Sequence, residues 1–476
     1  MRPSFPKPTR SRLPAAALLT LILSGCATLS EDAGFAPVAQ TTQARLGKEL
    51  MWPRSDADRS LVDQRVAELL QQPLSADDAV QIALLNNPGL QASFHALGIA
   101  DAERVQAGRL PNPGFTFGRL RQGSSTEIDR SLKFNLVRLL MLPTLQQLES
   151  RRFEQARGAL TLGVLSLAAQ TRKAYITALA ADQTVRYMRQ VQDAAEAGAE
   201  LARRQAQAGN WNKLQRAREQ GFYADAALNL ARADQARNAA REQLTRLMGL
   251  WGAPAQFHLP DRLPDLPKTA EDQPDIEQTA MAQRLDVQAA RAATAQLAQN
   301  LGLTRATRFV NVLELGAVRN SFSDASPQRG YEVTLELPLF DWGEARVAKA
   351  EAVYGQALAR TAQTAIDARS EVRAAYAAYR SSHDIARHYR DEIVPLQRRI
   401  SDENQLRYNG MLIGVFELLA DARSQIGSVN GYIEALRDFW LAQADLDMAL
   451  IGPPSLSPNA LFATPMPATD GGAAAH

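Results

Sequence analysis

The stretch YEVTLELPLFDWGE, residues 331–344, joins a strand pattern to a helix-start pattern. Apolar side chains occupy every second position for nine residues from Tyr331, with polar side chains between them. Such alternation is typical of a strand with one apolar and one polar face. Pro338 then ends the strand, because proline has no backbone N–H to donate to a neighbouring strand. Asp341 and Glu344 follow at the spacing of a helix capping box. The stretch therefore predicts a strand that passes directly into a helix.

Three further segments predict strands. Residues 128–136 show the same alternation, and the segments 114–121 and 309–319 precede the two strands across polar loops, so two hairpins are expected. Strands of about ten residues suit a tilted crossing of an outer membrane. A soluble, half-buried sheet would give the same pattern, and Arg130 on the otherwise apolar face favours an interfacial position.

The N-terminus predicts secretion. Residues 1–25 carry four bases and no acid, followed by an apolar run too short to remain as a spanning helix. Without these four bases the chain has 49 bases against 51 acids, a net charge of −2, which gives a nucleic-acid partner no electrostatic support. The run ends at Leu23-Ser-Gly-Cys26, and Cys26 is the only cysteine.

This ending resembles the bacterial lipoprotein box, in which Cys26 becomes the lipidated N-terminus. Ala27 stands where inner-membrane retention usually shows Asp, so the resemblance implies sorting to the outer membrane. The alternative is an ordinary signal peptide with a chance cysteine. The covalent lipid is the only prosthetic group expected, and no other cofactor is predicted.

The chain repeats itself at an offset of 201 residues. Arg172-Lys-Ala-Tyr175 matches Arg373-Ala-Ala-Tyr376, and Gly209 matches Gly410. Asn87-Pro-Gly-Leu90 lies opposite Arg284-Leu-Asp-Val287 with a shift of four. We expect a signal peptide (1–25), a lipid-anchored N-terminal segment (26–74), repeat 1 (75–251), a Pro- and Asp-rich linker (252–274), repeat 2 (275–452) and a flexible tail (453–476).

Each repeat contains a very long predicted helix, at about 144–208 and 342–407, with strands at about 114–137 and 309–340. Stepping by seven from Tyr354 and from Leu358 meets no charge over six steps, and a similar column starts at Phe153. This period indicates coiled helices about 100 Å long. A long solvent-crossing helix with an accidental apolar stripe is the alternative.

These features together resemble the TolC-type outer-membrane efflux proteins, in their lipoprotein branch, across about residues 75–452. The most specific segment is Leu337-Pro-Leu-Phe-Asp-Trp-Gly, whose junction residues are Pro338, Asp341, Trp342 and Gly343. Residues 137–142 (VRLLML) depart from it in the first repeat. The resemblance implies a mainly α fold with a small transmembrane β part: a homotrimer whose helices form an α-barrel and whose four strands per chain contribute to a 12-stranded β-barrel.

The resemblance also implies a periplasmic gate at the helix tips, around the turns at Gly209 and Gly410. In the family, acidic rings and Tyr and Arg contacts hold this aperture, which makes Glu417, Asp421, Arg407 and Tyr408 the candidates here. Ala420 occupies the second acidic position, so the sequence leaves open whether the gate has one acidic ring or two. Glu417 and Asp421, spaced i,i+4, would equally suit a solvated helix face. At both turns we expect glycine to supply a positive φ.

No catalytic or metal-binding motif is present in the sequence. His383 and His388 are five apart on a predicted helix and are expected at the surface. The leading prediction is a passive exit duct in the outer membrane that extends into the periplasm and is opened by a periplasmic adaptor (membrane fusion protein) and an inner-membrane pump of the RND type. The alternatives are a periplasmic scaffold or adaptor lipoprotein, or a lipid-anchored enzyme.

Overall fold

The computed structural model describes residues 29–307, 313–335 and 340–454, which form two compact units. Unit 1 draws on Met1–Phe35, Ala96–Arg157 and Ala290–Thr361, and unit 2 on Ala36–His95, Gly158–Ala289 and Ala362–His476. Each unit thus takes segments from both repeats. The predicted class, long helices with four strands, is confirmed.

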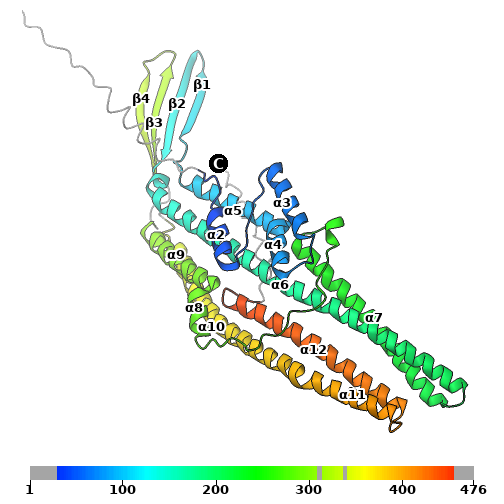
Figure 1. The fold of residues 1–476 in the computed structure, drawn as a ribbon. Coiled ribbons are helices and arrows are strands. Elements are labelled where there is room, and N and C mark those ends of the chain that lie inside the picture. The colour runs from blue at the N-terminus through cyan, green and yellow to red at the C-terminus, as the bar shows by residue number, and fades with distance from the viewer. Residues whose placement is uncertain (1–28, 308–312, 336–339, 455–476) are drawn as a thin grey trace, which may run out of the picture. The chain divides into compact units, whose positions relative to one another are not determined.

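Unit 1 contains one antiparallel sheet in the order β1-β2-β3-β4 (Figure 1). Its strands are β1 (Gly114–Gln122), β2 (Ser125–Asn135), β3 (Leu313–Phe322) and β4 (Gln328–Leu335). Each repeat supplies one hairpin, and β2 pairs with β3 to join the hairpins. Within the described strands, β1 and β4 are the sheet edges. A sheet with two edges requires partners if lipid surrounds it, because unpaired backbone groups are costly there.

The long helices are α6 (Leu136–Gln207) and the run α10 (Glu344–His388), η2 (Tyr389–Ile393) and α11 (Val394–Asn409). A π-helical turn, η2, interrupts the second run and ends two residues before Pro395. Helix α6 begins at Leu136, earlier than the 144 expected, and contains Pro143. Asn135 provides its start, since the Asn135 Oδ1 accepts the Arg138 amide at 2.8 Å.

The remaining helices flank these runs. They are α2 (Phe35–Leu46), α3 (Asp56–Leu69), α4 (Ala76–Asn86), α5 (Pro88–Ala107), α7 (Lys213–Met248), η1 (Ala253–Ala255), α8 (Ile276–Gln283), α9 (Leu285–Thr307) and α12 (Val415–Ala449). Capping boxes begin α3, α4 and α7, with Ser55, Ser75 and Asn212 as the N-caps.

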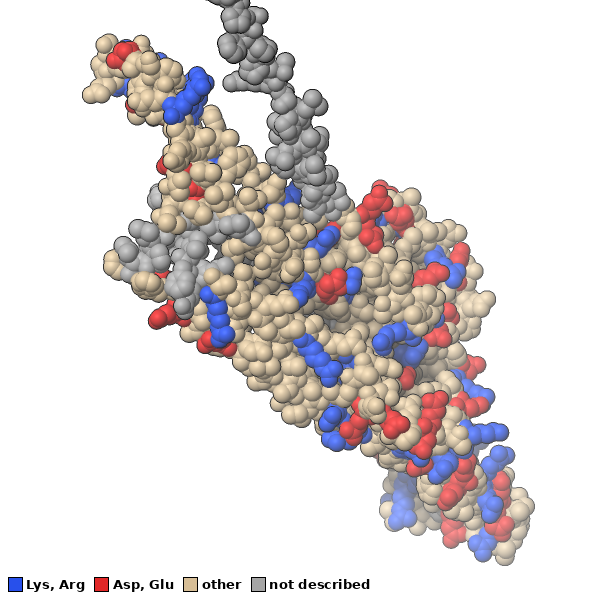
Figure 2. All heavy atoms as spheres, turned by 90° about the vertical axis from the view of Figure 1, so that its left-hand side faces the viewer, with Lys and Arg blue, Asp and Glu red and all other residues tan. Residues whose placement is uncertain are grey.

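The core of unit 2 centres on Phe439 of α12, which is fully buried. Tyr379 and Trp440 place their rings 5.5 Å and 5.1 Å from it. Away from this core, blue and red atoms intermingle over the helices of unit 2 in the space-filling view (Figure 2). The helices therefore pair through narrow apolar stripes and leave charged faces outside.

Candidate functional site

The turn between α6 and α7 follows the sequence prediction in its backbone. Gly209 has a φ of 78°, in the left-handed region that glycine enters at least cost. Asn212 then caps α7, because its side chain accepts the Gln215 amide at 2.8 Å. The chain therefore leaves α6 through a left-handed glycine, and an asparagine N-cap begins α7.

The turn between α11 and α12 differs from the prediction. Gly410 has a φ of −82°, and the left-handed residue is Met411, with a φ of 58°. The expectation of positive φ at Gly410 is therefore wrong. The amide of Leu412 donates to the Arg407 carbonyl at 2.8 Å, which closes a turn around Gly410 and forces the following residue into the unusual region.

The candidate gate residues do not share one environment. Arg407, Tyr408 and Glu417 are exposed, and Glu417 lies in the first turn of α12, where a carboxylate is favoured by the helix dipole. Asp421, one turn further, is only 8% exposed, and its Oδ2 has no hydrogen-bond partner within the described chain. Glu417 and Asp421 therefore do not lie together on one solvated face of α12.

An ion pair with a buried carboxylate joins the two repeats between α7 and α12. Glu219 of α7 is 2% exposed, and both of its oxygens lie 3.0 Å from the Arg423 guanidinium of α12. Arg423 also lies 4.3 Å from the ring centroid of Phe222. This pair was not predicted, because nothing in the local sequence pattern of α7 marks Glu219 as buried.

The far ends of the same helices are fixed by repeat-related residues. Asn86 and Asn87 donate side-chain amides to the carbonyls that end α7, at Met248, Gly249 and Leu247, over 2.8–3.1 Å.

In the second repeat, the Arg284 guanidinium donates to the Ala449 carbonyl near the end of α12, and the Leu285 amide donates to that of Ile451. Both segments had been matched by sequence alone. Their shared role is to satisfy the open carbonyls at a helix end.

Arg284 is buried and stands in an acidic setting. Its side chain is 1% exposed and lies 2.8 Å from Asp286 and 2.7 Å from Glu371. Burial alone would lower the pKa of Arg284, but the hydrogen bonds to the two carboxylates outweigh it and raise the pKa. The guanidinium therefore stays charged and ties α8, α9, α10 and α12 together.

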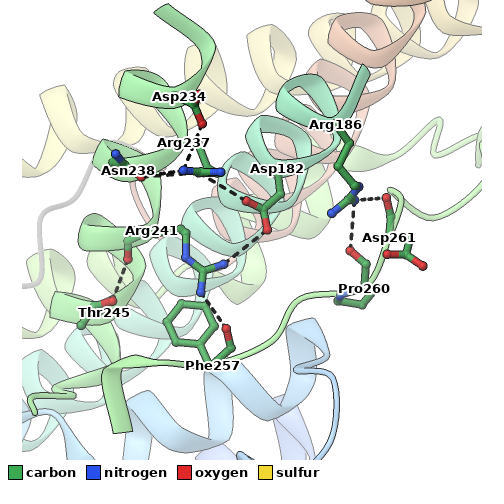
Figure 3. A network of polar contacts seen from close by, with 10 residues as sticks. All are labelled: Asp182, Arg186, Asp234, Arg237, Asn238, Arg241, Thr245, Phe257, Pro260 and Asp261. Carbon is green, nitrogen blue, oxygen red and sulfur yellow. Dashed lines mark hydrogen bonds and ion pairs between the residues drawn. The ribbon is translucent and has the colours of Figure 1, made fainter. Parts of the chain in front are cut away.

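The linker 252–274 is held along the helices by side chains (Figure 3). Arg241 of α7 donates to the Phe257 carbonyl at 2.6 Å and lies 3.3 Å from Asp182 of α6. Arg186 donates to the carbonyls of Pro260 and Asp261. The segment lacks strands, yet several of its carbonyls accept hydrogen bonds from side chains, as buried backbone groups require.

The second half of the linker is bound by repeat 2. Trp440 donates to the Pro264 carbonyl, Arg390 of η2 to that of Leu266, and Tyr379 accepts the Glu271 amide. His383 lies 3.1 Å from the Pro267 carbonyl and is 2% exposed, so its predicted surface position is wrong. The linker therefore covers the face of α10 that carries Tyr379 and His383. The helical pattern of α10 alone could not predict this contact.

The strand-to-helix junction of repeat 2 is built differently from a capping box. The Asp341 Oδ1 accepts the amide of Gly343 at 2.8 Å, Gly343 has a φ of 76°, and α10 begins only at Glu344. The predicted pairing of Asp341 with Glu344 is therefore replaced by a short Asx turn followed by glycine. Trp342 is exposed, and Pro338 lies outside the described residues.

Cys26 also lies outside the described residues, whereas Ser30, four residues further on, is held by α5. Ser30 donates from its amide and hydroxyl to Asp101 Oδ2 at 3.2 Å and 3.0 Å, and Arg104 contacts Asp101 Oδ1 at 2.5 Å. The hydrogen bonds from Arg104 and Ser30 outweigh the burial of Asp101 and lower its pKa.

No cluster of three or more His, Cys, Asp or Glu side chains among the described residues is arranged to hold a metal. None of the described helices combines the length and the apolar character needed to span a bilayer.

Comparison with known proteins identifies similar chains. Residues 276–430 match the family model "Outer membrane efflux protein". The cobalt-zinc-cadmium resistance protein CzcC of Cupriavidus metallidurans is 25% identical over 283 residues, which cover 56% of this chain and 64% of that protein.

Solved structures with a similar fold include two outer membrane channels. The open state of MtrE of Neisseria gonorrhoeae has a TM-score of 0.67 at 20% identity, covering 79% of this chain and 89% of that chain. CmeC of Campylobacter jejuni has a TM-score of 0.66 at 16% identity, covering 87% and 91%. At these identities the likeness concerns the fold.

Proposed function

We propose that this chain, whose residues 276–430 match the outer membrane efflux protein family model, is the outer-membrane exit channel of a tripartite efflux or export system. The single observation that carries the proposal is the open four-stranded sheet of unit 1. It exposes large apolar side chains, among them Tyr331 at 82%, Val333 at 55% and Phe115 at 66%. A soluble protein would cover such a face.

Three copies of the chain would close this sheet. The strand edges at β1 and β4 lack partners within the described chain, and twelve strands form a barrel in which every edge is paired. We propose a homotrimer in which β1 of one copy pairs with β4 of the next. The channel consumes no energy itself and passes substrate delivered by an RND-type pump through a periplasmic adaptor.

Lipid on Cys26 would anchor each copy after removal of residues 1–25. The hydrogen bond from Ser30 to Asp101 supports this proposal, since Ser30 is only four residues from Cys26 in the sequence and lies on unit 1, the unit that holds the sheet. Replacing Cys26 with Ala should abolish incorporation of labelled palmitate, whereas continued incorporation would refute the anchor.

The periplasmic gate is proposed at the α11–α12 turn, with Glu417 as its acidic ring and Arg407 and Tyr408 beside it. Three exposed carboxylates in a narrow aperture would attract cations and repel one another. Asp421 is assigned to the wall instead of a second ring, because it is buried within one chain.

The gate is tested by Glu417→Ala in planar bilayers. Loss of the ring should weaken block by divalent cations and change single-channel conductance. Glu103→Ala on α5, an exposed glutamate of unit 1, is the matched control and should behave as wild type. Identical conductance and block in wild type and Glu417→Ala would remove the assignment.

The alternative, a periplasmic scaffold or adaptor lipoprotein, makes a different prediction. Such a protein would remain a soluble body after lipid removal and would carry no pore. Release of a trapped dye from liposomes by purified protein, together with a three-chain mass in detergent, supports the channel. Absence of both would favour the scaffold.

A further inference from the structure

The face of the unit 1 sheet that carries the exposed apolar side chains changes from apolar to basic along the strands. Near the helices it is apolar, with cross-strand pairs such as Phe115↔Leu132, Phe134↔Leu315 and Leu313↔Leu335. Toward the hairpin turns the same face becomes basic. The register places five arginines on it: Arg119, Arg121, Arg130, Arg319 and Arg329.

Three of these arginines stand side by side across adjacent strands. Arg130 of β2 is directly opposite Arg319 of β3, which is directly opposite Arg329 of β4. Like charges directly opposite one another destabilise a sheet unless an anion compensates them. No ion pair to any of the five exists within the described residues, and the one side-chain bond is a 3.4 Å contact from Arg130 to Ser321. Basic side chains near this end are visible in Figure 2.

The opposite face of the sheet carries the acids. Glu127 and Asp129 of β2 lie on the face opposite to Arg130, and on that same face Lys133 pairs with Glu332 at 3.3 Å across Gly316 of β3. A solvated surface without a binding role would carry positive and negative side chains on both faces of the sheet. Here the basic groups gather on the apolar side, and the carboxylates lie on the other side of the sheet.

The position along the strands matches a membrane boundary. In the sequence the apolar alternation runs from Tyr331 through Leu339, eight residue steps or about 27 Å along a strand, which at the usual tilt gives about 20 Å of height. Arg329 is the next residue on that face toward the turn. The arginines therefore lie where an apolar belt of about 25 Å would end and headgroups begin.

We propose that these five arginines form a binding site for the phosphate groups of lipids in the outer leaflet around the channel. This inference rests on the proposed membrane location of the sheet. Guanidinium groups bind phosphate through two parallel hydrogen bonds, which a row of neighbouring arginines can repeat on a diphosphorylated headgroup. Acyl chains of the same lipid would lie on the apolar pairs below, so one molecule satisfies both parts of the face.

The experiment compares lipid A, which carries two phosphates, with the same lipid after enzymatic removal of the phosphates. Native mass spectrometry of the purified full-length assembly in neutral detergent measures bound lipid. We expect the phosphorylated lipid to bind at least about tenfold more tightly, since charge-assisted contacts of this kind differ by that factor or more. Equal binding of both lipids by the wild-type protein would overturn the proposal without any mutation.

A triple variant locates the site. Arg130→Gln, Arg319→Gln and Arg329→Gln together should abolish the preference for phosphate. The matched control replaces three exposed arginines of α7, Arg216, Arg218 and Arg232, and should keep it. Arg→Lys at the three sheet positions preserves charge and should retain part of the preference, because lysine lacks the bidentate geometry. A full preference in the triple Gln variant would also overturn the proposal.

Two further readouts separate the outcomes. Millimolar inorganic phosphate should not displace lipid A; complete displacement would indicate a free-anion site and refute a lipid site. Conductance in bilayers of neutral lipid should be the same in the triple variant and wild type. A protein that binds lipid A selectively yet never conducts would refute the channel while leaving the lipid site standing.

Discussion

At the scale of residues, buried charges rather than apolar contacts distinguish this chain. Arg284, Glu219 and Asp101 are each almost fully buried, and each joins segments far apart in sequence. The burial of these charges could not be predicted from the local sequence pattern, because the residues that cover them are distant in the chain. Removal of one partner of such a pair leaves the other charge buried and uncompensated.

Arg284→Met tests this at the end of α12. The variant leaves Glu371 and Asp286 without their counter-charge and the Ala449 carbonyl without its side-chain donor. We expect a loss of about 3–5 kcal/mol in the free energy of unfolding. Arg291→Met, at an exposed position of α9, should change it by less than about 0.5 kcal/mol. Denaturant unfolding in detergent, followed by circular dichroism, measures both; equal effects would contradict the role of Arg284.

Asp101 makes the anchoring of Ser30 depend on pH. Its pKa is lower in the folded chain, so its contribution is complete above the ordinary pKa of about 4 and is lost as the pH falls through the lowered value. Asp101→Asn should therefore lose stability at pH 7 and show a flatter fall in stability below pH 4 than wild type. Parallel acid curves for wild type and Asp101→Asn would contradict this, and Glu103→Gln serves as the exposed control.

At the scale of elements, the sequence predicted the kinds of element better than their joints. The strands and long helices follow from alternation and a seven-residue period. The joints depend on single backbone conformations: Met411 rather than Gly410 takes the positive φ, and an Asx turn at Asp341 replaces a capping box. The π turn at 389–393 is likewise set by packing, since Tyr389 lies against Gly431.

The joint after α7 is tested by Gly249→Ala. A Cβ at this position would lie 2.5 Å from the Asn86 carbonyl oxygen, and φ is 66°. Gly252 is a matched control because its φ is 68° and nothing lies within 4 Å of its Cβ position. Gly252→Ala should cost only the left-handed strain, about 1 kcal/mol, whereas Gly249→Ala should cost about 1–3 kcal/mol more. Equal midpoints of unfolding would refute the close packing of Gly249.

The two faces of β4 are tested by placing a charge on each. Leu335 lies opposite Leu313 on the apolar face, and Thr334 lies opposite Glu314 on the polar face. Leu335→Arg should lower the yield of membrane-assembled protein, with a cost of about 2–4 kcal/mol per copy near the bilayer centre. Thr334→Arg should assemble normally. Heat-modifiable mobility in mild gel electrophoresis reports assembly, and equal yields would argue against a lipid-facing Leu335.

At the scale of the whole molecule, the duplication organises both units. Each repeat gives one hairpin to the sheet and one pair of long helices, and equivalent segments at Asn87 and Arg284 fix the helix ends. The sequence predicted this plan because a repeat is visible along the chain. It could not predict the path of the linker, whose carbonyls are bound by Arg186, Arg241 and Trp440, since those contacts depend on three-dimensional packing.

The central claim is that copies of this chain form a pore. The most direct measurement is single-channel recording after reconstitution of the purified full-length protein at its assembled mass. The account predicts discrete conductance steps, altered by Glu417→Ala and unaltered by Glu103→Ala. A correctly folded and membrane-inserted assembly in which neither the wild type nor Glu417→Ala ever conducts would contradict it.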